Sequence, residues 1–231
     1  MYTAILLAGG FGSRLHSISG GTPKPLMPIA NVPFVYHIMT KLEREGCSKI
    51  ILALHYGAEI FEKRLAVDNP VSVPVVQVIE PQPLGTGGAI KYASSWVDDD
   101  FVLILNADTY CDVNFMDFVT FSSEVGNSVV VTKRESSERY GSVLLTPDSK
   151  RVRGFREKQA SGPSQINAGI YVFRKNEIGQ WQEGAFSLER DYLPDMAQKG
   201  LSAYLHEGLF VDIGVPEDYL WADQNLRFLG D

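Results

Sequence analysis

The chain has 231 residues, of which 45% are hydrophobic and 21% charged, and these values exclude a disordered protein. Its net charge of −7 argues against a general nucleic-acid-binding or membrane-surface protein. Cys47 and Cys111 are too few for a disulfide framework or a zinc site, so we expect two reduced thiols. We expect no signal peptide, and no run approaches the ~18 apolar residues of a membrane span. The sequence therefore predicts a soluble cytoplasmic protein with no nucleic-acid or membrane partner.

The first half of the chain alternates short apolar runs with segments of helical periodicity. The apolar runs predict strands at residues 4–7, 49–54, 73–79 and 101–105. Helical spacing or a glycine-rich start predicts helices at residues 33–45, 58–67 and 85–96. Because strand and helix alternate, we expect an α/β fold, with a parallel sheet and helices on both of its faces.

The second half contains more strand and less helix. Strands are predicted at residues 128–133, 141–146, 152–157 and 170–173, and helices at residues 188–199 and 216–229. No internal repeat, low-complexity segment or flexible linker divides the chain. We therefore expect a single domain, in which residues up to about 113 form a nucleotide-binding half and the rest a mixed half.

Residues 7–25 read LAGGFGSRLHSISGGTPKP and begin where the first predicted strand ends. Glycines let a ligand approach the backbone, and successive N–H groups in such a loop bind anions. Arg14 adds planar donors that match a phosphate, and Lys24 stands between two prolines that stiffen its backbone. The dinucleotide fingerprint fails because Leu15 replaces its last glycine, and no Walker A loop occurs. We interpret the segment as a phosphate-binding loop; a tight turn without a ligand is the less favoured alternative.

A second glycine-rich segment, LGTGGAI at residues 84–90, begins four residues after Glu80, at a predicted strand-to-helix junction. Its glycines permit close approach to a flat ring and expose N–H donors. Taken alone, a helix start with a flexible turn explains the segment equally well. Together with the first loop, it favours a wall that binds a nucleotide base.

Two acidic residues stand at the ends of predicted apolar strands. Asp108 ends the triplet Asn106-Ala107-Asp108 after the run FVLIL, and Asp212 lies in FVDIG. Carboxylates at strand ends commonly hold a metal ion that bridges phosphates. Taken alone, Asp108 is equally well explained as a cap of the next turn. As a pair, the two acids predict one Mg²⁺ site, which requires them to converge in space.

Weaker candidates lie in the second half of the chain. Gly141, the pair Glu157-Lys158 and the segment 167–171 (NAGIY) have residue types that suit sugar hydroxyls and phosphate, but each is also explained as a turn or a solvated charge. The segment 189–191 (ERD) is interpreted as an exposed helix start with a minor role. The four histidines show no ligand spacing, and no Ser/His/Asp or Cys/His arrangement is present.

With these motifs assembled, the chain resembles the sugar-1-phosphate nucleotidylyltransferases over nearly its whole length. The resemblance rests on LAGGFGSRL with PKP, EPQPLGTGGAI, NAD, FREK, NAGIYVF and FVDIGVPEDY. Within that family it is most similar to the short guanylyltransferases acting on D-glycero-D-manno-heptose 1-phosphate, and more generally to mannose-1-phosphate guanylyltransferases. The resemblance implies a Rossmann-like, mostly parallel mixed sheet flanked by helices, of the nucleotide-diphospho-sugar transferase type, with a small β-rich sugar-binding part.

The resemblance also implies roles for individual residues. Those implied for catalysis are Arg14, Lys24 and Asp108, and those implied for Mg²⁺ are Asp108 and Asp212. Residues implied to bind the nucleotide are Leu7, Ala8, Gly9, Gly10, Gly12, Ser13, Arg14, Glu80, Pro83, Gly85 and Thr86. Residues implied to bind the sugar phosphate are Asn106, Gly141, Glu157, Lys158, Asn167 and Gly169.

The implied reaction is attack by a sugar 1-phosphate oxygen on the α-phosphorus of GTP, with pyrophosphate leaving. The nucleophile is already an anion, since a phosphate monoester has a second pKa of ~6, so no general base is required. The expected partners are GTP and a sugar 1-phosphate, with a homodimer as the assembly considered. The alternatives are a mannose-1-phosphate guanylyltransferase, then a uridylyl- or thymidylyltransferase, and, outside the enzymes, a regulatory subunit that binds a nucleotide sugar. Since the chain ends at Asp231, we expect no C-terminal β-helix and no acetyltransferase activity.

Overall fold

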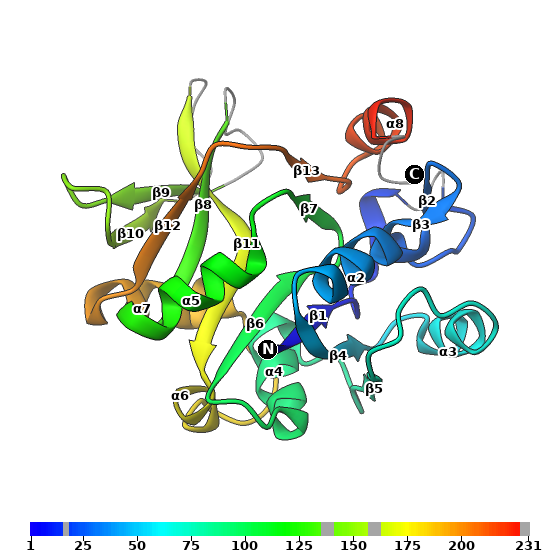
Figure 1. Ribbon diagram of the computed structural model, residues 1–231, viewed down its shortest axis with the longest axis horizontal. Helices are drawn as coiled ribbons and strands as arrows, with labels where there is room; N and C mark the ends of the chain where they lie inside the picture. The colour runs from blue at the N-terminus through cyan, green and yellow to red at the C-terminus, as the bar shows by residue number, and fades with distance from the viewer. Residues whose placement is uncertain (16–18, 135–140, 157–162, 227–231) are drawn as a thin grey trace.

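A computed structural model of the chain describes residues 1–15, 19–134, 141–156 and 163–226. Its centre is a nine-stranded sheet with the order β10-β9-β11-β6-β1-β4-β5, in which β8 pairs with β11 and β12 (Figure 1). The strands are β1 (Tyr2–Leu7), β4 (Cys47–Leu54), β5 (Val75–Ile79), β6 (Phe101–Asn106), β8 (Ser128–Arg134), β9 (Ser142–Leu145), β10 (Val152–Arg156), β11 (Ser164–Arg174) and β12 (Ser202–His206). Two small ribbons pair β2 (Pro28–Ile29) with β3 (Val32–Pro33), and β7 (Thr109–Cys111) with β13 (Phe210–Asp212).

The strand directions confirm a mostly parallel, mixed sheet. Strand β1 pairs in parallel with β4 and with β6, and β4 pairs in parallel with β5. Strand β11 runs antiparallel to β6 and to β8, so β8 has the same direction as β6, and β12 is parallel to β8. Strands with the direction of β6 therefore lie on both sides of the reversed strand β11, and β10, which is antiparallel to β9, is reversed as well.

Helices cover both faces of the sheet, as the alternation of elements predicts. They are α2 (Phe34–Arg44), α3 (Ala58–Val67), α4 (Gly85–Ala93), α5 (Phe115–Val125), α6 (Lys175–Gly179), α7 (Leu193–Lys199) and α8 (Pro216–Asn225). Strand β1 contributes Ala4 and Leu6 to a core with α2, α3, α5 and α8, and Ile5 to a second core with α4, α6 and α7. Successive residues of a strand point to opposite faces, so one apolar run fills both cores. Figure 1 shows α2 and α5 over the same face of the sheet.

Most predicted elements are present within a few residues of their expected bounds. Strand β11 is longer than the predicted 170–173, and the predicted helix 188–199 begins with a π-helical turn, Leu188–Tyr192, before α7. Helix α8 ends at Asn225, and residues 227–229 of its prediction lie outside the described residues. Among the described helices, none is long and apolar enough to cross a membrane.

The elements that were not predicted are β2, β3, β7, α5, α6 and β12. Helix α5 buries Phe115 and Phe118 and packs Met116, Val119 and Phe121 against the core, so the sequence does contain a helical pattern there, and Asn114 caps its start by accepting the N–H of Asp117. Among the described strands, β12 forms a ladder with β8 and otherwise has only an isolated bridge between Ser202 and Arg151, so it lies near a sheet edge, where the residues alternate less clearly. Strand β7 has three residues and is too short to give a pattern.

The first turn of α4 packs closely against residues 184–188. The N–H groups of Gly87 and Gly88 donate to the carbonyl of Phe186 over 3.1 and 3.4 Å. A methyl group on Gly88 would collide with the carbonyl oxygen of Gly184, and one on Gly87 would collide with the ring of Phe186. The prediction that the glycines of LGTGGAI expose N–H donors to a ligand is therefore wrong for these two. They let another segment of the chain approach the helix.

Replacing Gly88 by alanine is expected to destabilise the protein, because the added methyl group meets a backbone oxygen that cannot rotate away. Overpacking of this kind costs about 1–3 kcal/mol, and the gain in helix propensity of about 1 kcal/mol offsets only part of that cost. Urea unfolding at pH 7 measures the change. Gly179→Ala is the control, since a methyl group at this helical position meets no atom within 4 Å. Equal stability of the two variants would contradict the packing.

Candidate active site

The ammonium group of Lys24 lies between the two carboxylates that were predicted to act together. Lys24 belongs to a 3₁₀ turn, Lys24–Leu26, and only 9% of it is exposed. Its Nζ is 2.5 Å from Asp108 Oδ2 and 3.5 Å from Asp212 Oδ1. A cation so little exposed needs nearby negative charge, and the two carboxylates supply it. Lys24 is thereby fixed in place rather than left free in solvent.

The ribbon of β7 and β13 brings Asp108 and Asp212 together. Asp108 immediately precedes β7, and Asp212 is the last residue of β13, where it pairs with Thr109. The N–H of Ile213 donates to the carbonyl of Asp108 over 3.1 Å, and the N–H of Gly214 donates to Asp212 Oδ1 over 2.7 Å. The convergence of the two acids that a shared Mg²⁺ site requires, which the sequence alone does not show, is present in the structure.

Position 214 accommodates only glycine without disturbing this group of charges. A methyl group there would lie 2.7 Å from Asp212 Oδ1 and 3.2 Å from Lys24 Nζ. Gly12 has a similar relation to Lys24: its φ is +57°, and a methyl group on it would lie 3.1 Å from the Cβ of the lysine. Gly12 combines a backbone conformation that favours glycine with a close approach to another side chain.

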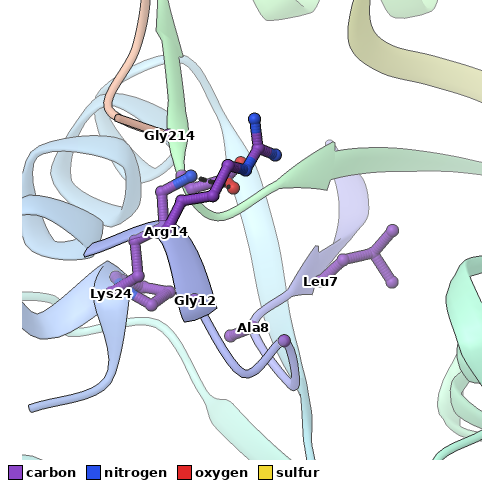
Figure 2. A pocket seen from close by; sticks show the side chains of 9 residues that line it. Leu7, Ala8, Gly12, Arg14, Lys24 and Gly214 are labelled. Carbon is purple, nitrogen blue, oxygen red and sulfur yellow. Dashed lines mark hydrogen bonds and ion pairs between the residues drawn. The ribbon is translucent and has the colours of Figure 1, made fainter. Parts of the chain in front are cut away.

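The glycine-rich segment after β1 forms one wall of a small cavity of about 180 Å³. Figure 2 shows the Lys24 side chain extending from this wall toward Gly214, with the Arg14 side chain extending in the same direction. Arg14 is exposed, in contrast to Lys24. The lining residues are Leu7, Ala8, Gly10, Gly12, Arg14, Lys24, Pro25, Asp108 and Gly214. Two basic groups therefore face a cavity of a size suited to phosphate groups.

A second cavity, of about 340 Å³, contains the other residues predicted for the nucleotide. Its predicted members are Leu7, Gly9, Gly10, Glu80, Pro83, Gly85 and Thr86. The lining also includes residues that were not predicted to bind the nucleotide, namely Phe11, Ala53, His55 and Ala89. Ser13 begins the 3₁₀ turn Ser13–Leu15, and its side chain lies outside what the structure describes. Together the two cavities account for every other residue predicted to bind the nucleotide.

Glu80 is the buried acid of the second cavity, with 7% of its surface exposed. Its Oε2 accepts the N–H of Leu84 over 2.9 Å, and a methyl group on Gly9 would lie 3.0 Å from its Oε1. Burial raises the pKa of Glu80 above its usual value of 4.5, and the hydrogen bond from Leu84 partly opposes this rise. A carboxylate that faces a cavity from such a position is well placed to accept hydrogen bonds from a ligand.

The largest of these cavities has a volume of about 970 Å³ and is lined by the residues predicted for the sugar phosphate. Those described are Asn106, Gly141, Asn167 and Gly169, whereas Glu157 and Lys158 lie outside the described residues. Asn167 donates through Nδ2 to the hydroxyl of Tyr171 over 2.7 Å and accepts the N–H of Gly169 over 2.9 Å. Gly169 has a φ of +70°, and a methyl group on it would collide with the amide of Asn106. These contacts fix both amides at the cavity wall.

Several residues of this large cavity were missed or underestimated. Glu189 and Arg190, interpreted as an exposed helix start, line the cavity from the π-helical turn. Ala168 and Tyr171 line it too and belong to the weaker candidate segment 167–171, whereas the unpredicted lining residues are Thr109, Phe155, Arg156, Leu193, Pro194 and Phe210. Some of them lie in motifs that carry the resemblance, such as FREK and NAGIYVF, but single side chains in such motifs give no signal of their own.

Asp108 lines all three cavities. The small cavity and the large one also share Arg14 and Lys24, and the second cavity and the large one share Asn106. The three spaces therefore meet at Asp108, and the large cavity there is lined by two basic side chains, Arg14 and Lys24, and by two carboxylates, Asp108 and Asp212. Such a junction suits two phosphorylated ligands that approach from different sides.

The model of the nucleotidyl transferase family matches residues 3–227 of the chain. The chain belongs to the nucleotidyl transferase family. This nucleotidyl transferase is 35% identical to the D-glycero-alpha-D-manno-heptose 1-phosphate guanylyltransferase of Aneurinibacillus thermoaerophilus over 231 residues, which cover 97% of the chain and 98% of that relative. It is 36% identical to the mannose-1-phosphate guanylyltransferase catalytic subunit beta of Drosophila melanogaster, over 94% of the chain and 60% of that relative. The chain thus spans about 60% of the length of such mannose-1-phosphate guanylyltransferase subunits.

Solved structures agree with this membership. The crystal structure of HddC from Yersinia pseudotuberculosis matches the nucleotidyl transferase with a TM-score of 0.89 and 38% identity, covering 98% of this chain and all of that one. The same protein complexed with GMP-PN matches with a TM-score of 0.88. A putative glucose-1-phosphate thymidylyltransferase from Bacillus anthracis matches with a TM-score of 0.84 at 20% identity, over 98% of this chain and 96% of that one, which shows a common fold.

The raised pKa of Glu80 predicts a pH-dependent effect of Glu80→Gln on this nucleotidyl transferase. The folded state holds the proton of Glu80 more tightly than the unfolded state does, so the contribution of Glu80 to stability is lost as the pH rises above 4.5 through the folded-state pKa. Glutamine does not titrate. We therefore expect the stability of Glu80→Gln relative to the wild type to increase between pH 4.5 and pH 7, as measured by urea unfolding without nucleotide. The exposed Glu59→Gln controls for the loss of one charge. A relative stability that is constant or falls with pH would contradict the assignment.

Proposed function

We propose that this protein transfers GMP from GTP to a sugar 1-phosphate, with heptose 1-phosphate the favoured acceptor, and releases pyrophosphate. The observation that carries the proposal is the meeting of three cavities at Asp108, beside Lys24 and Arg14. One cavity suits a nucleoside, the small one suits phosphates, and the large one suits a sugar. Transfer between two phosphorylated ligands requires their phosphates to meet at such a junction.

Catalysis in this proposal rests on positioning and on charge. A sugar phosphate oxygen attacks the α-phosphorus of GTP, the bond to the β-phosphate oxygen breaks, and pyrophosphate leaves with that electron pair. The nucleophile is already ionised near neutral pH, because the second pKa of a phosphate monoester is ~6. Two anions must be held together against their repulsion, and negative charge on the leaving group must be stabilised.

Lys24 and Arg14 are the side chains that supply this stabilisation. A lysine ammonium has three N–H donors, and two carboxylates lie within reach of Lys24, at 2.5 and 3.5 Å, so one donor remains for a phosphate oxygen. Arg14 offers several parallel donors from an exposed position at the small cavity. We assign both to the phosphates of GTP, where their positive charge favours departure of pyrophosphate.

The residues present fit a Mg²⁺ ion. Asp108 and Asp212 both reach the single cation position that Lys24 occupies, and carboxylate oxygens are the ligands that Mg²⁺ prefers. We propose that these two residues hold the ion beside the ammonium of Lys24. When bound, Mg²⁺ supplies a template for phosphate oxygens and a Lewis acid.

Glu80 supports guanine as the base. The Watson–Crick edge of guanine presents neighbouring N–H donors, and a carboxylate is an acceptor-only group that can take two of them. Glu80 is buried and directed toward Gly9 in the second cavity, where a base would lie between the glycine-rich loop and α4. The HddC complex with GMP-PN agrees with this choice.

Heptose 1-phosphate is favoured by the relative from Aneurinibacillus thermoaerophilus, which matches the chain over nearly the full length of both proteins. Mannose 1-phosphate is the second candidate acceptor, and transfer of a uridylyl or thymidylyl group comes third. A regulatory subunit is disfavoured, because Arg14, Lys24 and both carboxylates are present. We further propose a cytoplasmic enzyme with one nucleotide-binding and one sugar-phosphate-binding half, the boundary falling near residue 113.

Arg14→Ala and Asp108→Asn are each expected to lower turnover at least ~100-fold, the scale of losing one oriented transition-state contact. The measurement is pyrophosphate release in a screen that crosses four nucleoside triphosphates with mannose, heptose, glucose and N-acetylhexosamine 1-phosphates. Arg64→Ala and Asp195→Asn, which alter exposed ion pairs on α3 and α7, are the matched controls. Near-normal turnover by either active-site variant would overturn the assignment, and no turnover of any pair by the wild type would favour the regulatory subunit.

Glu80→Gln is expected to reduce the preference for GTP over the other triphosphates by roughly 10- to 100-fold, since one oriented hydrogen-bond pair contributes about 1–3 kcal/mol to base discrimination. The amide can still accept the N–H of Leu84 but keeps only one acceptor oxygen. The ratio of kcat/KM for GTP to that for UTP, at saturating sugar phosphate, measures the effect. Glu59→Gln is again the control, and an unchanged ratio in Glu80→Gln would exclude Glu80 from base recognition.

A further inference from the structure

Glu189 is a carboxylate that is connected to both the nucleotide side and the sugar side of the site. It lies in the π-helical turn Leu188–Tyr192 and lines the large cavity. Its Oε2 accepts the hydroxyl of Thr86 over 2.6 Å and the hydroxyl of Ser187 over 2.9 Å. Thr86 lies at the start of α4 and lines the second cavity, which the proposed function assigns to the nucleotide and which is called the nucleotide cavity below. π-helical turns of this kind are frequent at functional sites.

The hydroxyl of Thr86 is already used within the protein. Its single proton is donated to Glu189, and its oxygen accepts the N–H of Leu188 over 2.9 Å. A threonine hydroxyl has one donor, so Thr86 has none left for a base or a ribose. The structure therefore gives Thr86 a task different from direct nucleotide contact, which is to hold Glu189 in place.

The second carboxylate oxygen of Glu189 lacks a hydrogen-bond partner among the described residues, and its side chain is half-buried at the wall of the large cavity. Tyr171, a buried residue with 1% of its surface exposed, also belongs to the cavity lining, and its hydroxyl accepts a hydrogen bond from Asn167 over 2.7 Å. Burial, with the charge of Glu189, raises the pKa of Tyr171, so its phenol keeps its proton and remains a donor.

A carboxylate acceptor on this wall matches the hydroxyl groups of a sugar, each of which can donate a hydrogen bond. The phosphate of the same ligand would lie at the cationic side chains of Lys24 and Arg14, which line the large cavity as well. A carboxylate would repel a phosphate, so Glu189 suits the ring hydroxyls and not the anionic end of the ligand.

We propose that Glu189 is the acceptor for a ring hydroxyl of the sugar 1-phosphate, and that Thr86 positions it from the nucleotide side. This inference rests on the proposed function, since it assigns the large cavity to a sugar phosphate. The ligand class is a polyhydroxylated sugar 1-phosphate that donates a hydrogen bond to the second carboxylate oxygen of Glu189. Thr86 is a positioning residue for the sugar, although it lines the nucleotide cavity.

Steady-state kinetics of four variants test the proposal. Glu189→Gln replaces an acceptor by a donor, and it should raise the KM for the sugar phosphate roughly tenfold or more, the scale of a lost hydrogen bond to a charged group, while the KM for GTP changes less than about twofold. Thr86→Val keeps the shape of the side chain but removes both hydrogen bonds of its hydroxyl. It should likewise raise the KM for the sugar phosphate and leave the KM for GTP nearly unchanged. Thr86→Ser keeps the hydroxyl, so its KM for the sugar phosphate should be close to that of the wild type. Glu183→Gln, on an exposed residue of the preceding loop, is the matched control.

A sugar analogue that lacks one hydroxyl adds a readout that a purely structural role would not change. The deoxy analogue that lacks the contacted hydroxyl should have a raised KM with the wild type, but no further loss with Glu189→Gln, since both changes remove the same hydrogen bond. The proposal would be overturned if the effect of Glu189→Gln and the effect of the missing hydroxyl on KM were additive for every deoxy analogue. It would also be overturned if Thr86→Val raised the KM for GTP and left that for the sugar phosphate unchanged. Absence of turnover by the wild type would instead refute the proposed function.

Discussion

The ion pair of Lys24 with Asp108 and Asp212 is the interaction on which the site depends. An ammonium group that is 9% exposed is stable only with negative charge beside it, and removing either carboxylate would leave a poorly solvated charge. Several local features serve this one contact. The prolines that flank Lys24 stiffen its turn, and the ribbon of β7 and β13 aligns the two acids. Gly214 leaves room for all three groups.

The contact between α4 and residues 184–189 is the second constraint, because it connects the two halves of the chain. Phe186 fits against Gly87, and its carbonyl accepts the N–H groups at the start of the helix. The same segment carries Glu189 to Thr86. Helix α4, which lines the second cavity, is therefore held by residues 184–189, of which Glu189 lines the large cavity. Neither of the two segments can move far without the other.

The sequence was sufficient for the elements whose apolar patterns are strong, such as β6 and α2, and for the residues of the glycine-rich loop. It was insufficient where the structure depends on contacts between distant segments. The approach of Asp212 to Asp108 follows from the pairing of β7 with β13, and β7 is too short to be recognised. The glycines of LGTGGAI were predicted correctly as a place of close approach, but Gly87 and Gly88 are approached by residues 184–188 of the chain itself. Glu189 was underestimated, since a charged residue at a helix start is usually solvated.

The reversed direction of β11 has a consequence for how such an enzyme can diversify. Because β11 runs antiparallel to β6, Asn167 and Gly169 lie near its beginning, at the same edge where β6 reaches its end at Asn106. In the proposed function, the nucleotide donor would lie where parallel strands end, and the sugar-phosphate acceptor would contact the start of the opposing strand β11 together with the end of β6. Substitutions around the start of β11 can alter acceptor choice without altering the strands that carry the donor site. One sheet thereby holds two specificities that evolution, or an engineer, can change one at a time.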